Sequence, residues 1–232
     1  MLLYIIRHGD PIYNPDSLTE LGKIQAWAVA KRLAKNGIDK IYSSPLIRAQ
    51  QTAEPTAILL KKEVKIEDWT SENVAVKYFW DRREGKNTWI INSCKEHFHK
   101  SVKEYGFKWY DDPYYEGIPV KEGYETFLNN SNEFLARHGY KHDREKCCYI
   151  AEKPNDERIA VFCHQGFGLS WLGTLLDIPL PLVWADFDFT HTGVTVVRFE
   201  GKRCIPKVLT LSNDSHLYKE DLPTKHNNVI YI

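Results

Sequence analysis

Residues 2–9, which read LLYIIRHG, decide the fold class of this chain. The first five are continuously apolar and rich in β-forming residues, a pattern typical of a buried strand in a parallel sheet. In open α/β sheets, ligands bind just beyond the carboxyl ends of the strands. Arg7, His8 and Gly9 follow this strand, and they offer a cation, a titratable nitrogen nucleophile and a close approach of the backbone. Together these groups suit the binding of a phosphate.

Length and charge indicate one domain with no general affinity for polyanions. The 232 residues are enough for a single α/β domain with an insertion. The 31 Lys and Arg residues balance the 31 Asp and Glu residues, so neither nucleic acid nor an anionic membrane is an expected partner. Any affinity for anions therefore has to come from a local cluster. The sequence leaves the oligomeric state open.

Cysteine usage and hydropathy predict a cytoplasmic protein. The 5 cysteines are odd in number and show no Cys-x-x-Cys spacing. The N-terminus enters a strand at once, without a basic leader, so we expect no targeting segment. No apolar run approaches the length of a membrane span.

Further segments extend the α/β pattern along the chain. A helix is expected over residues 18–35, where Asn36-Gly37 ends it, and another over 166–176. Short apolar strands are predicted at 38–42, 64–66, 158–163, 193–199 and 206–211. A turn separates the last two strands, which are therefore expected to be antiparallel. The fold class that this order predicts is α/β, a three-layer α/β/α sandwich with a mostly parallel sheet.

A third helix is expected to begin at Ser44-Pro45. Serine is a favourable N-cap, and proline is favourable at the first helical position. Arg48 then lies in the first turn, from which its side chain can point towards the strand ends. Pro55 is expected to kink or interrupt this helix.

The character of the sequence changes between residues 73 and 155, where aromatic residues are dense and the alternation of strands and helices lapses. We expect a single domain over 1–232, with 73–155 as an inserted, mainly helical cap and a loop at 111–123. Most of the aromatic side chains are expected to form the cap's own core. A group of basic residues is expected on a solvated face, with a second anion subsite as the alternative: Lys77, Arg82, Arg83 and Lys86.

Four predicted strands run into reactive groups. Arg7-His8 follows the first strand, Arg48 follows the second, residues 68–72 follow the third, and His164 follows the strand that ends at 163. Because the carboxyl ends of parallel strands share one edge of the sheet, these side chains are expected to converge. Two histidines, two arginines and a carboxylate can then line a single pocket.

This ordered set of motifs resembles the histidine phosphatase superfamily, the phosphoglycerate-mutase-like group, and its phosphatase branch in particular. The resemblance covers the sheet domain and leaves the cap unexplained. It is carried by Arg7-His8-Gly9, Asn14, the segment LTELG at 18–22, Gln25-Ala26, the segment SSPLIRAQQTA at 43–53, and His164-Gln165-Gly166.

The resemblance implies a role for each matching residue. His8 is the nucleophile that forms a phosphohistidine, Arg7 and Arg48 clamp the phosphoryl oxygens, and His164 stabilises the transition state. Glu72 stands where the family carries its general acid, although Asp68 and Glu67 are close competitors for that role. The implied activity is hydrolysis of a small phosphate monoester without a cofactor or a metal.

Elementary chemistry is consistent with this assignment. A neutral imidazole can attack phosphorus directly, and the covalent intermediate divides one difficult step into two. Guanidinium groups fit phosphate oxygens bidentately, and they meet the charge of the transferring phosphoryl group. The neighbouring Arg7 and Arg48 are expected to disfavour protonation of His8, so activity should persist into mildly acidic pH.

Four more residues are candidates with open structural alternatives. Asn14 is a candidate phosphate ligand that could equally shape its loop, and Gln165 could offer a backbone N–H at a helix start. Thr19 is a candidate pocket residue or a helix cap. His191 could face the pocket from the loop before the 193–199 strand.

The sequence supports several alternative functions to different degrees. A phosphoglycerate mutase is the main alternative, but residues 72–76 read ENVAV where mutases carry a Glu-Arg-His-Tyr-Gly-like segment. A binding module with little turnover is a further alternative. A cysteine phosphatase is disfavoured because Leu169 stands where the arginine after Cys163 would be required. Metal catalysis is disfavoured because His97, His99, His138 and His142 lack the accompanying motifs.

Overall fold

The computed structural model describes residues 1–93, 95–226 and 230–231. At its centre lies a six-stranded sheet with the order β13-β11-β1-β10-β4-β5. The strands β1, β10, β4 and β5 are mutually parallel, whereas β11 is antiparallel to both β1 and β13. The predicted α/β class with a mostly parallel sheet is therefore confirmed. The strand bounds are Leu2–Arg7 (β1), Lys40–Ser43 (β4), Val64–Ile66 (β5), Arg158–Cys163 (β10), Val194–Arg198 (β11) and Lys207–Asn213 (β13).

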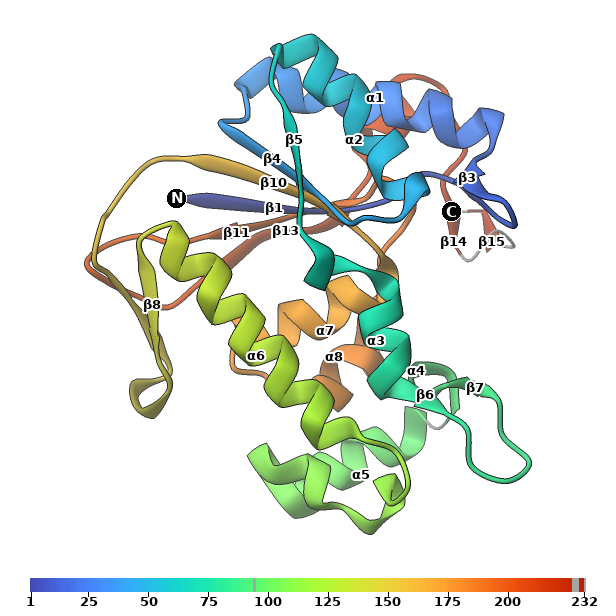
Figure 1. The fold of residues 1–232 in the computed structure, drawn as a ribbon, viewed down its shortest axis with the longest axis vertical. Helices are drawn as coiled ribbons and strands as arrows, with labels where there is room; N and C mark the ends of the chain where they lie inside the picture. The colour runs from blue at the N-terminus through green and yellow to red at the C-terminus, as the bar shows by residue number, and fades with distance from the viewer. Residues whose placement is uncertain (94, 227–229, 232) are drawn as a thin grey trace.

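Helices cover both faces of this sheet, as the three-layer prediction requires (Figure 1). Helices α1 and α2 lie on one face, and the short helix α9 contacts α1. Helices α3, α6, α7 and α8 lie on the other face. The bounds are Glu20–Asn36 (α1), Ile47–Leu60 (α2), Glu72–Phe79 (α3), Val120–Arg137 (α6), Gln165–Leu175 (α7), Leu180–Asp186 (α8) and Ser215–Lys219 (α9).

The register of the parallel strands brings their carboxyl ends together. Arg7 is paired with Cys163 in the sheet, and Ser43 is paired with Phe162 on one side and Ile66 on the other. Apolar burial holds this register, because Leu3, Ile5 and Ile6 of β1 are completely buried. The residues that follow the strands therefore stand side by side at one edge.

Helix α1 approaches the loop after β1 so closely that glycine is required there. Thr19 caps the helix by accepting a hydrogen bond from the backbone N–H of Gly22 at 3.0 Å. A Cβ atom on Gly9 would lie 2.7 Å from the carbonyl oxygen of Gly22. The glycine after His8 thus fixes the loop against the helix start.

The start of helix α2 differs from the prediction. The helix begins at Ile47 with Leu46 as its N-cap residue, and no side chain of Ser44 or Pro45 caps it. The Ser44 hydroxyl instead bonds to His164, and the carboxylate of Asp16 accepts from the N–H of Ile47. The Ser44 hydroxyl also accepts from the N–H of Leu46, which precedes the helix, so the bond to the first helical N–H comes from Asp16.

The expectation that Pro55 interrupts α2 is also wrong. The helix continues from Ile47 to Leu60 with Pro55 buried inside it. An internal proline costs a helix about 3 kcal/mol through a lost hydrogen bond and a steric clash. Packing of α2 against α1, β4 and β10 along its length offsets this cost.

The segment 73–155 adds no strand to the six-stranded sheet within the described residues. It contains α3, α6 and α5 (Lys95–Tyr105), with 3₁₀ turns at Gly106–Asp111 and Pro113–Tyr115. Its other elements are β6 (Trp80–Asp81), β7 (Thr88–Trp89), α4 (Ile90–Ser93), β8 (Tyr140–Asp143), a 3₁₀ turn at Arg144–Lys146 and β9 (Cys148–Ala151), which also pairs with β12 (Arg203–Cys204). Two short hairpins lie elsewhere, β2 (Pro11–Tyr13) with β3 (Asp16–Leu18) and β14 (Lys225–His226) with β15 (Ile230–Tyr231).

Helix α6 of this segment belongs to the helical layer on one face of the sheet. Helix α6 lies along the sheet face, and the ring of Phe134 packs edge-on against Tyr42 of β4 with centroids 5.2 Å apart. One hydrophobic core therefore runs from the sheet into the insertion. Most of the insertion's large aromatic residues are core residues, but they belong to this shared core and not to a core of the cap alone, including Phe79, Phe98 and Trp109.

The predicted loop at 111–123 is shorter than expected, because α6 already begins at Val120. Gly123 is a helical residue and packs on α3, where an added Cβ would lie 2.5 Å from the Cβ of Tyr78. The glycine allows a close helix contact and does not mark a turn. Among the described residues, no helix combines the length and the apolar character that crossing a membrane requires.

Candidate active site

His8 is held in one orientation at the end of β1. Its ring is buried, and its backbone N–H donates to the carbonyl of Cys163 at 2.9 Å. Ring atom Nδ1 lies 2.7 Å from the carbonyl oxygen of Gly9. Because a carbonyl oxygen only accepts hydrogen bonds, Nδ1 carries the proton and Nε2 carries the free lone pair. The ring therefore presents a nucleophilic nitrogen of defined position.

Burial keeps this imidazole neutral. Desolvation, together with the nearby His164 and Arg7, lowers the pKa of His8 well below its usual value. The hydrogen bond to Gly9 acts in the opposite direction but does not outweigh these effects. The attacking form of His8 is thus present even in mildly acidic solution.

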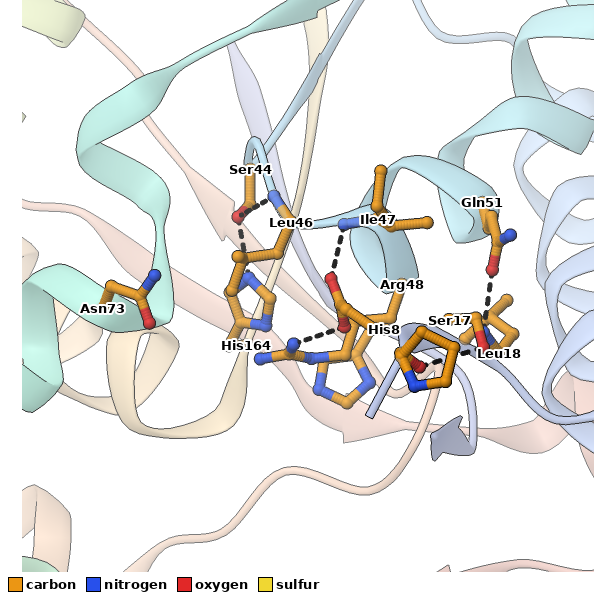
Figure 2. Close-up of polar contacts among 12 residues, drawn as sticks. His8, Ser17, Leu18, Ser44, Leu46, Ile47, Arg48, Gln51, Asn73 and His164 are labelled. Carbon is orange, nitrogen blue, oxygen red and sulfur yellow. Dashed lines mark hydrogen bonds and ion pairs between the residues drawn. The ribbon is translucent and has the colours of Figure 1, made fainter. Parts of the chain in front are cut away.

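His164 lies next to His8 and is fixed by a serine hydroxyl. The two imidazole centroids are 5.1 Å apart, and Nε2 of His164 lies 2.7 Å from Oγ of Ser44 (Figure 2). That oxygen already accepts from the N–H of Leu46 at 3.3 Å, so its own hydrogen can be donated to Nε2. Nδ1 of His164 is then the protonated nitrogen. Burial, Arg48 and Arg7 lower the pKa of His164 well below its usual value.

Arg48 reaches the same cluster from the first turn of α2. Its Nη1 forms a 2.6 Å ion pair with Oδ1 of Asp16, whose Oδ2 accepts from the N–H of Ile47 at 2.7 Å (Figure 2). The ring of Tyr13 lies 5.3 Å from the guanidinium carbon. Asp16 thus caps α2 and orients Arg48 through a single carboxylate. Sequence analysis missed Asp16, because only the β2–β3 hairpin brings it to the helix.

Arg7 supplies a second buried guanidinium. Its Nη1 donates to the carbonyl of Phe189, and burial lowers its pKa. Within the described part of the chain, the buried Nε atoms of Arg7 and Arg48 find no hydrogen-bond partner. Buried N–H donors need an acceptor, which the oxygens of a phosphoryl group supply.

Glu72 occupies the N-terminus of helix α7. Its Oε1 accepts from the N–H of Gly166 at 3.0 Å and its Oε2 from the N–H of Phe167 at 2.8 Å. These bonds and the two arginines favour the carboxylate, yet burial dominates and raises the pKa of Glu72 above its usual value. A carboxyl group that keeps its proton at higher pH is suited to act as a general acid.

The two competing acids lie in different surroundings. Both carboxylate oxygens of Glu67 are paired with Arg137, each at 2.9 Å. Asp68 is exposed. Of these three acids, only Glu72 is placed by the structure beside Arg7 and Arg48.

The environments of Gln165 and Asn14 differ from those expected of phosphate ligands. Gln165 donates from Nε2 to Oδ1 of Asp188. The next two backbone N–H groups, those of Gly166 and Phe167, donate to Glu72. Asn14 is exposed in the turn between β2 and β3. Their assignment as phosphate ligands stays a prediction.

Thr19 and His191 are linked through Asp10. Thr19 donates to Oδ2 of Asp10 at 2.7 Å in addition to capping α1. Nδ1 of His191 lies 3.6 Å from Oδ1 of the same carboxylate, and its ring centroid is 5.8 Å from that of His8. His191 therefore lies beside His8, whereas Thr19 is connected to His191 through Asp10.

A cavity of about 540 Å³ adjoins Glu72. Its walls come from the insertion, from α7 and from the end of α8 with the loop after it. Trp89 and Glu72 both lie against Gly166, since an added Cβ there would lie 3.0 Å from the indole of Trp89 and 3.1 Å from Oε1 of Glu72. The remaining lining residues are Ile91, Asn92, Gln165, Leu169, Trp184, Ala185, Asp186, Phe187 and Asp188. No sequence motif links these residues, so sequence analysis missed the cavity.

The environments of Cys163 and of three histidines in the insertion bear on the alternatives of cysteine and metal catalysis. Burial raises the pKa of the Cys163 thiol, which disfavours a thiolate nucleophile. His97, His99 and His142 each contact a separate carboxylate, namely Asp112, Asp186 and Asp177. In the described ranges, no group of three or more His, Cys, Asp or Glu side chains is arranged to hold a metal ion.

The basic residues of the insertion are largely engaged with neighbouring side chains. Arg83 is bound to Asp81 through Nη2 at 2.8 Å, and Nζ of Lys86 lies 3.4 Å from the same carboxylate. Lys77 donates to the hydroxyl of Tyr78. None of the four basic residues lines the cavity beside Glu72, so the structure does not favour the alternative of a second anion subsite there.

Comparison with known proteins shows which family this chain matches. The family model described as "Histidine phosphatase superfamily (branch 1)" matches residues 3–213. A curated relative from Hydrogenobacter thermophilus, "Putative phosphoserine phosphatase 2", is 26% identical over 210 residues, which cover 87% of this chain and 91% of the relative. "Probable phosphoglycerate mutase" of Yersinia pestis is 44% identical, but over 61 residues that cover 22% of this chain and 28% of that protein.

A solved structure shares the fold. The phosphoserine phosphatase mutant of Entamoeba histolytica, in complex with phosphoserine, superposes with a TM-score of 0.61 at 21% identity. The match covers 93% of this chain and 98% of that chain. The likeness therefore extends through the sheet and both helical layers.

Proposed function

The chain belongs to the histidine phosphatase superfamily, and we propose that it hydrolyses phosphate monoesters through a phosphohistidine on His8, without a cofactor. The observation that carries this proposal is the hydrogen bond of Nδ1 to the Gly9 carbonyl, which leaves Nε2 as a neutral nucleophile. Arg7, Arg48 and His164 surround this nitrogen with donors suited to phosphoryl oxygens.

In the first step, the lone pair of His8 Nε2 attacks phosphorus and forms a P–N bond. The ester P–O bond breaks, and its electron pair leaves with the alcohol oxygen. Glu72 donates the proton that this oxygen needs, in keeping with the raised pKa of its carboxyl group. The guanidinium groups of Arg7 and Arg48 hold the equatorial oxygens, where negative charge is concentrated.

In the second step, water attacks the phosphohistidine from the side that the alcohol has left. Glu72, now ionised, takes a proton from this water. The P–N bond breaks, its electron pair returns to Nε2, and inorganic phosphate is released. Both steps use the same residues, and atoms and charges balance without an added reactant.

Hydrolysis is favoured over a mutase reaction. The phosphoserine phosphatase relative matches most of this chain, whereas the mutase match covers 22% of it. The Entamoeba phosphoserine phosphatase has been crystallised with phosphoserine and with 3-phosphoglyceric acid. We accordingly propose a small phosphorylated molecule as the substrate, and a cytoplasmic location in keeping with the free thiols of Cys147, Cys148, Cys163 and Cys204.

Turnover of p-nitrophenyl phosphate tests the proposal. The wild type should hydrolyse it in the presence of EDTA, and His8→Ala should not. Loss of wild-type turnover on chelation would contradict the metal-free mechanism. An inert wild type that interconverts phosphoglycerates would establish a mutase, and an inert wild type that binds vanadate would indicate a binding module.

A further inference from the structure

The cavity beside Glu72 is the space that the alcohol part of the substrate has to occupy. Glu72 lines this cavity and also lies close enough to Arg7 and Arg48 for their positive charges to favour its ionised form. A phosphoryl group held by the arginines therefore directs its ester oxygen towards Glu72 and the rest of the molecule into the cavity. The chemistry of the cavity walls then selects the alcohol.

The charges on these walls are of one sign. Asp186 and Asp188 contribute two carboxylates in addition to the carboxyl group of Glu72, which holds its proton until the ester is cleaved, and among the described lining residues there is no lysine or arginine. Asp188 also lies close enough to Arg7 for the two charges to interact. Asp186 is half-exposed at the rim, where Oδ1 lies 3.0 Å from Nε2 of His99. A carboxylate or a second phosphate on the leaving group would meet the carboxylates of Asp186 and Asp188 on walls that carry no lysine or arginine among the described residues.

The remaining walls are mostly aromatic and apolar. Trp89 lies against Gly166 next to Glu72, and it belongs to the β6–β7 hairpin, in which its ring packs on Trp80 at a centroid distance of 5.5 Å. Trp184 and Phe187 line the same space. Aromatic faces combined with carboxylates form the chemical environment that binds ammonium groups.

We infer that the substrate is a phosphate monoester of an amino alcohol, whose leaving group carries an ammonium group and no carboxylate. This inference rests on the proposed function, and it goes beyond it by naming the leaving group. The ammonium group would lie between the indole of Trp89 and the carboxylates of Asp186 and Asp188. Phosphoserine is named in the curated relative and is bound in one solved neighbour, and 3-phosphoglyceric acid is bound in another. Each of these molecules carries a carboxylate in addition to its phosphate, which these walls disfavour.

A pair of isosteric substrates isolates the positive charge. Phosphocholine and 3,3-dimethylbutyl phosphate have nearly the same shape, and they differ in carrying nitrogen or carbon at the branched centre. The expected kcat/KM for phosphocholine exceeds that for the neutral isostere by about tenfold. Phosphoethanolamine should also exceed the neutral ester, and phosphoserine and 3-phosphoglycerate should be the poorest substrates.

Asp186→Asn tests whether the wall recognises this charge. Its side chain is half-exposed, so the variant should fold normally. The preference for phosphocholine should fall by about fivefold. Asp177→Asn is the matched control, because Asp177 forms a similar 3.0 Å contact with His142 outside the cavity. This control should keep the full preference.

Binding separates a failure of the inference from a failure of the proposed function. Titration calorimetry on His8→Ala measures the affinity for phosphocholine and for its neutral isostere whether or not the wild type turns over. Tighter binding of phosphocholine supports the ammonium site. Equal affinities, or equal use of 3-phosphoglycerate and phosphocholine by the wild type, would overturn it. An inert wild type with a clear preference in binding would contradict only the proposed reaction.

Discussion

His8, Arg48 and His164 follow neighbouring parallel strands, whereas Trp89 and Asp186 of the adjoining cavity come from a hairpin and a helix end outside the sheet. The first set is buried, combines neutral imidazoles with the guanidinium of Arg48 and is held by short hydrogen bonds. The second is open, acidic and aromatic. Strand register fixes the first set, and the packing of the insertion fixes the second. One part of the site therefore sets the chemistry, and the other sets the choice of alcohol.

The largest effect that separates the two regions is expected from the phosphate arginines. Arg48→Lys should lower kcat/KM for every ester by about 10²- to 10³-fold, because a lysine cannot keep the paired geometry that meets the transferring phosphoryl group. Arg137→Lys is the control, since Arg137 forms a two-pronged pair with Glu67 and does not line the cavity. A loss confined to one class of alcohol would contradict the division between the two regions.

Glu72 joins the two regions, so its removal should depend on the leaving group. Glu72→Gln should lower kcat for alkyl esters by about 10²- to 10³-fold, and by less for p-nitrophenyl phosphate, whose phenolate leaves without a proton. The raised pKa of Glu72 also predicts that the wild-type rate on alkyl esters declines on the alkaline side as this proton is lost. That alkaline limb should disappear in Glu72→Gln, and its persistence would assign the acid to another group.

Asp16→Asn should give an intermediate effect through Arg48. Asparagine can still cap the N–H of Ile47 but removes the charge that holds the guanidinium. The affinity for vanadate should fall by about tenfold, with little change in thermal stability. Asp143→Asn, which removes the partner of Lys146 from a pair outside the cavity, is the control. A loss of stability without a change in vanadate affinity would leave Asp16 as a helix cap alone.

The smallest effect concerns stability in acid. Burial holds the pKa of His8 and His164 well below the usual value, and that of His216 at about 3. Below pH 6.5 the unfolded chain takes up protons that the folded chain does not, so folding stability falls as the pH falls. Each such histidine contributes up to about 1.4 kcal/mol per pH unit.

Urea unfolding between pH 7.5 and pH 5 measures this dependence. His216→Gln should show a shallower decline than the wild type, whereas His99→Gln, which changes a half-exposed histidine at the cavity rim, should not. An equal decline in both variants would show that other groups control the acid stability.

The sheet edge could be predicted from sequence because local patterns determine it. Apolar runs specify the strands, and parallel pairing places whatever follows them together, as it does for His8 and His164. The local pattern predicts a helix cap at Ser44, whereas its partner His164 lies 120 residues away and is brought to it by the parallel sheet. The cavity was not predictable, since Trp89 and Asp186 meet only through tertiary packing of segments without a common motif.

The most direct test of the account is to trap the covalent intermediate. Rapid acid-free quenching during turnover, followed by peptide mass spectrometry, should show a phosphoryl group on His8 that is stable in alkali and absent from His8→Ala. Its formation should not require a metal ion. A phosphoryl group on another residue, or turnover without any phosphoenzyme at the shortest times, would contradict nucleophilic catalysis by His8.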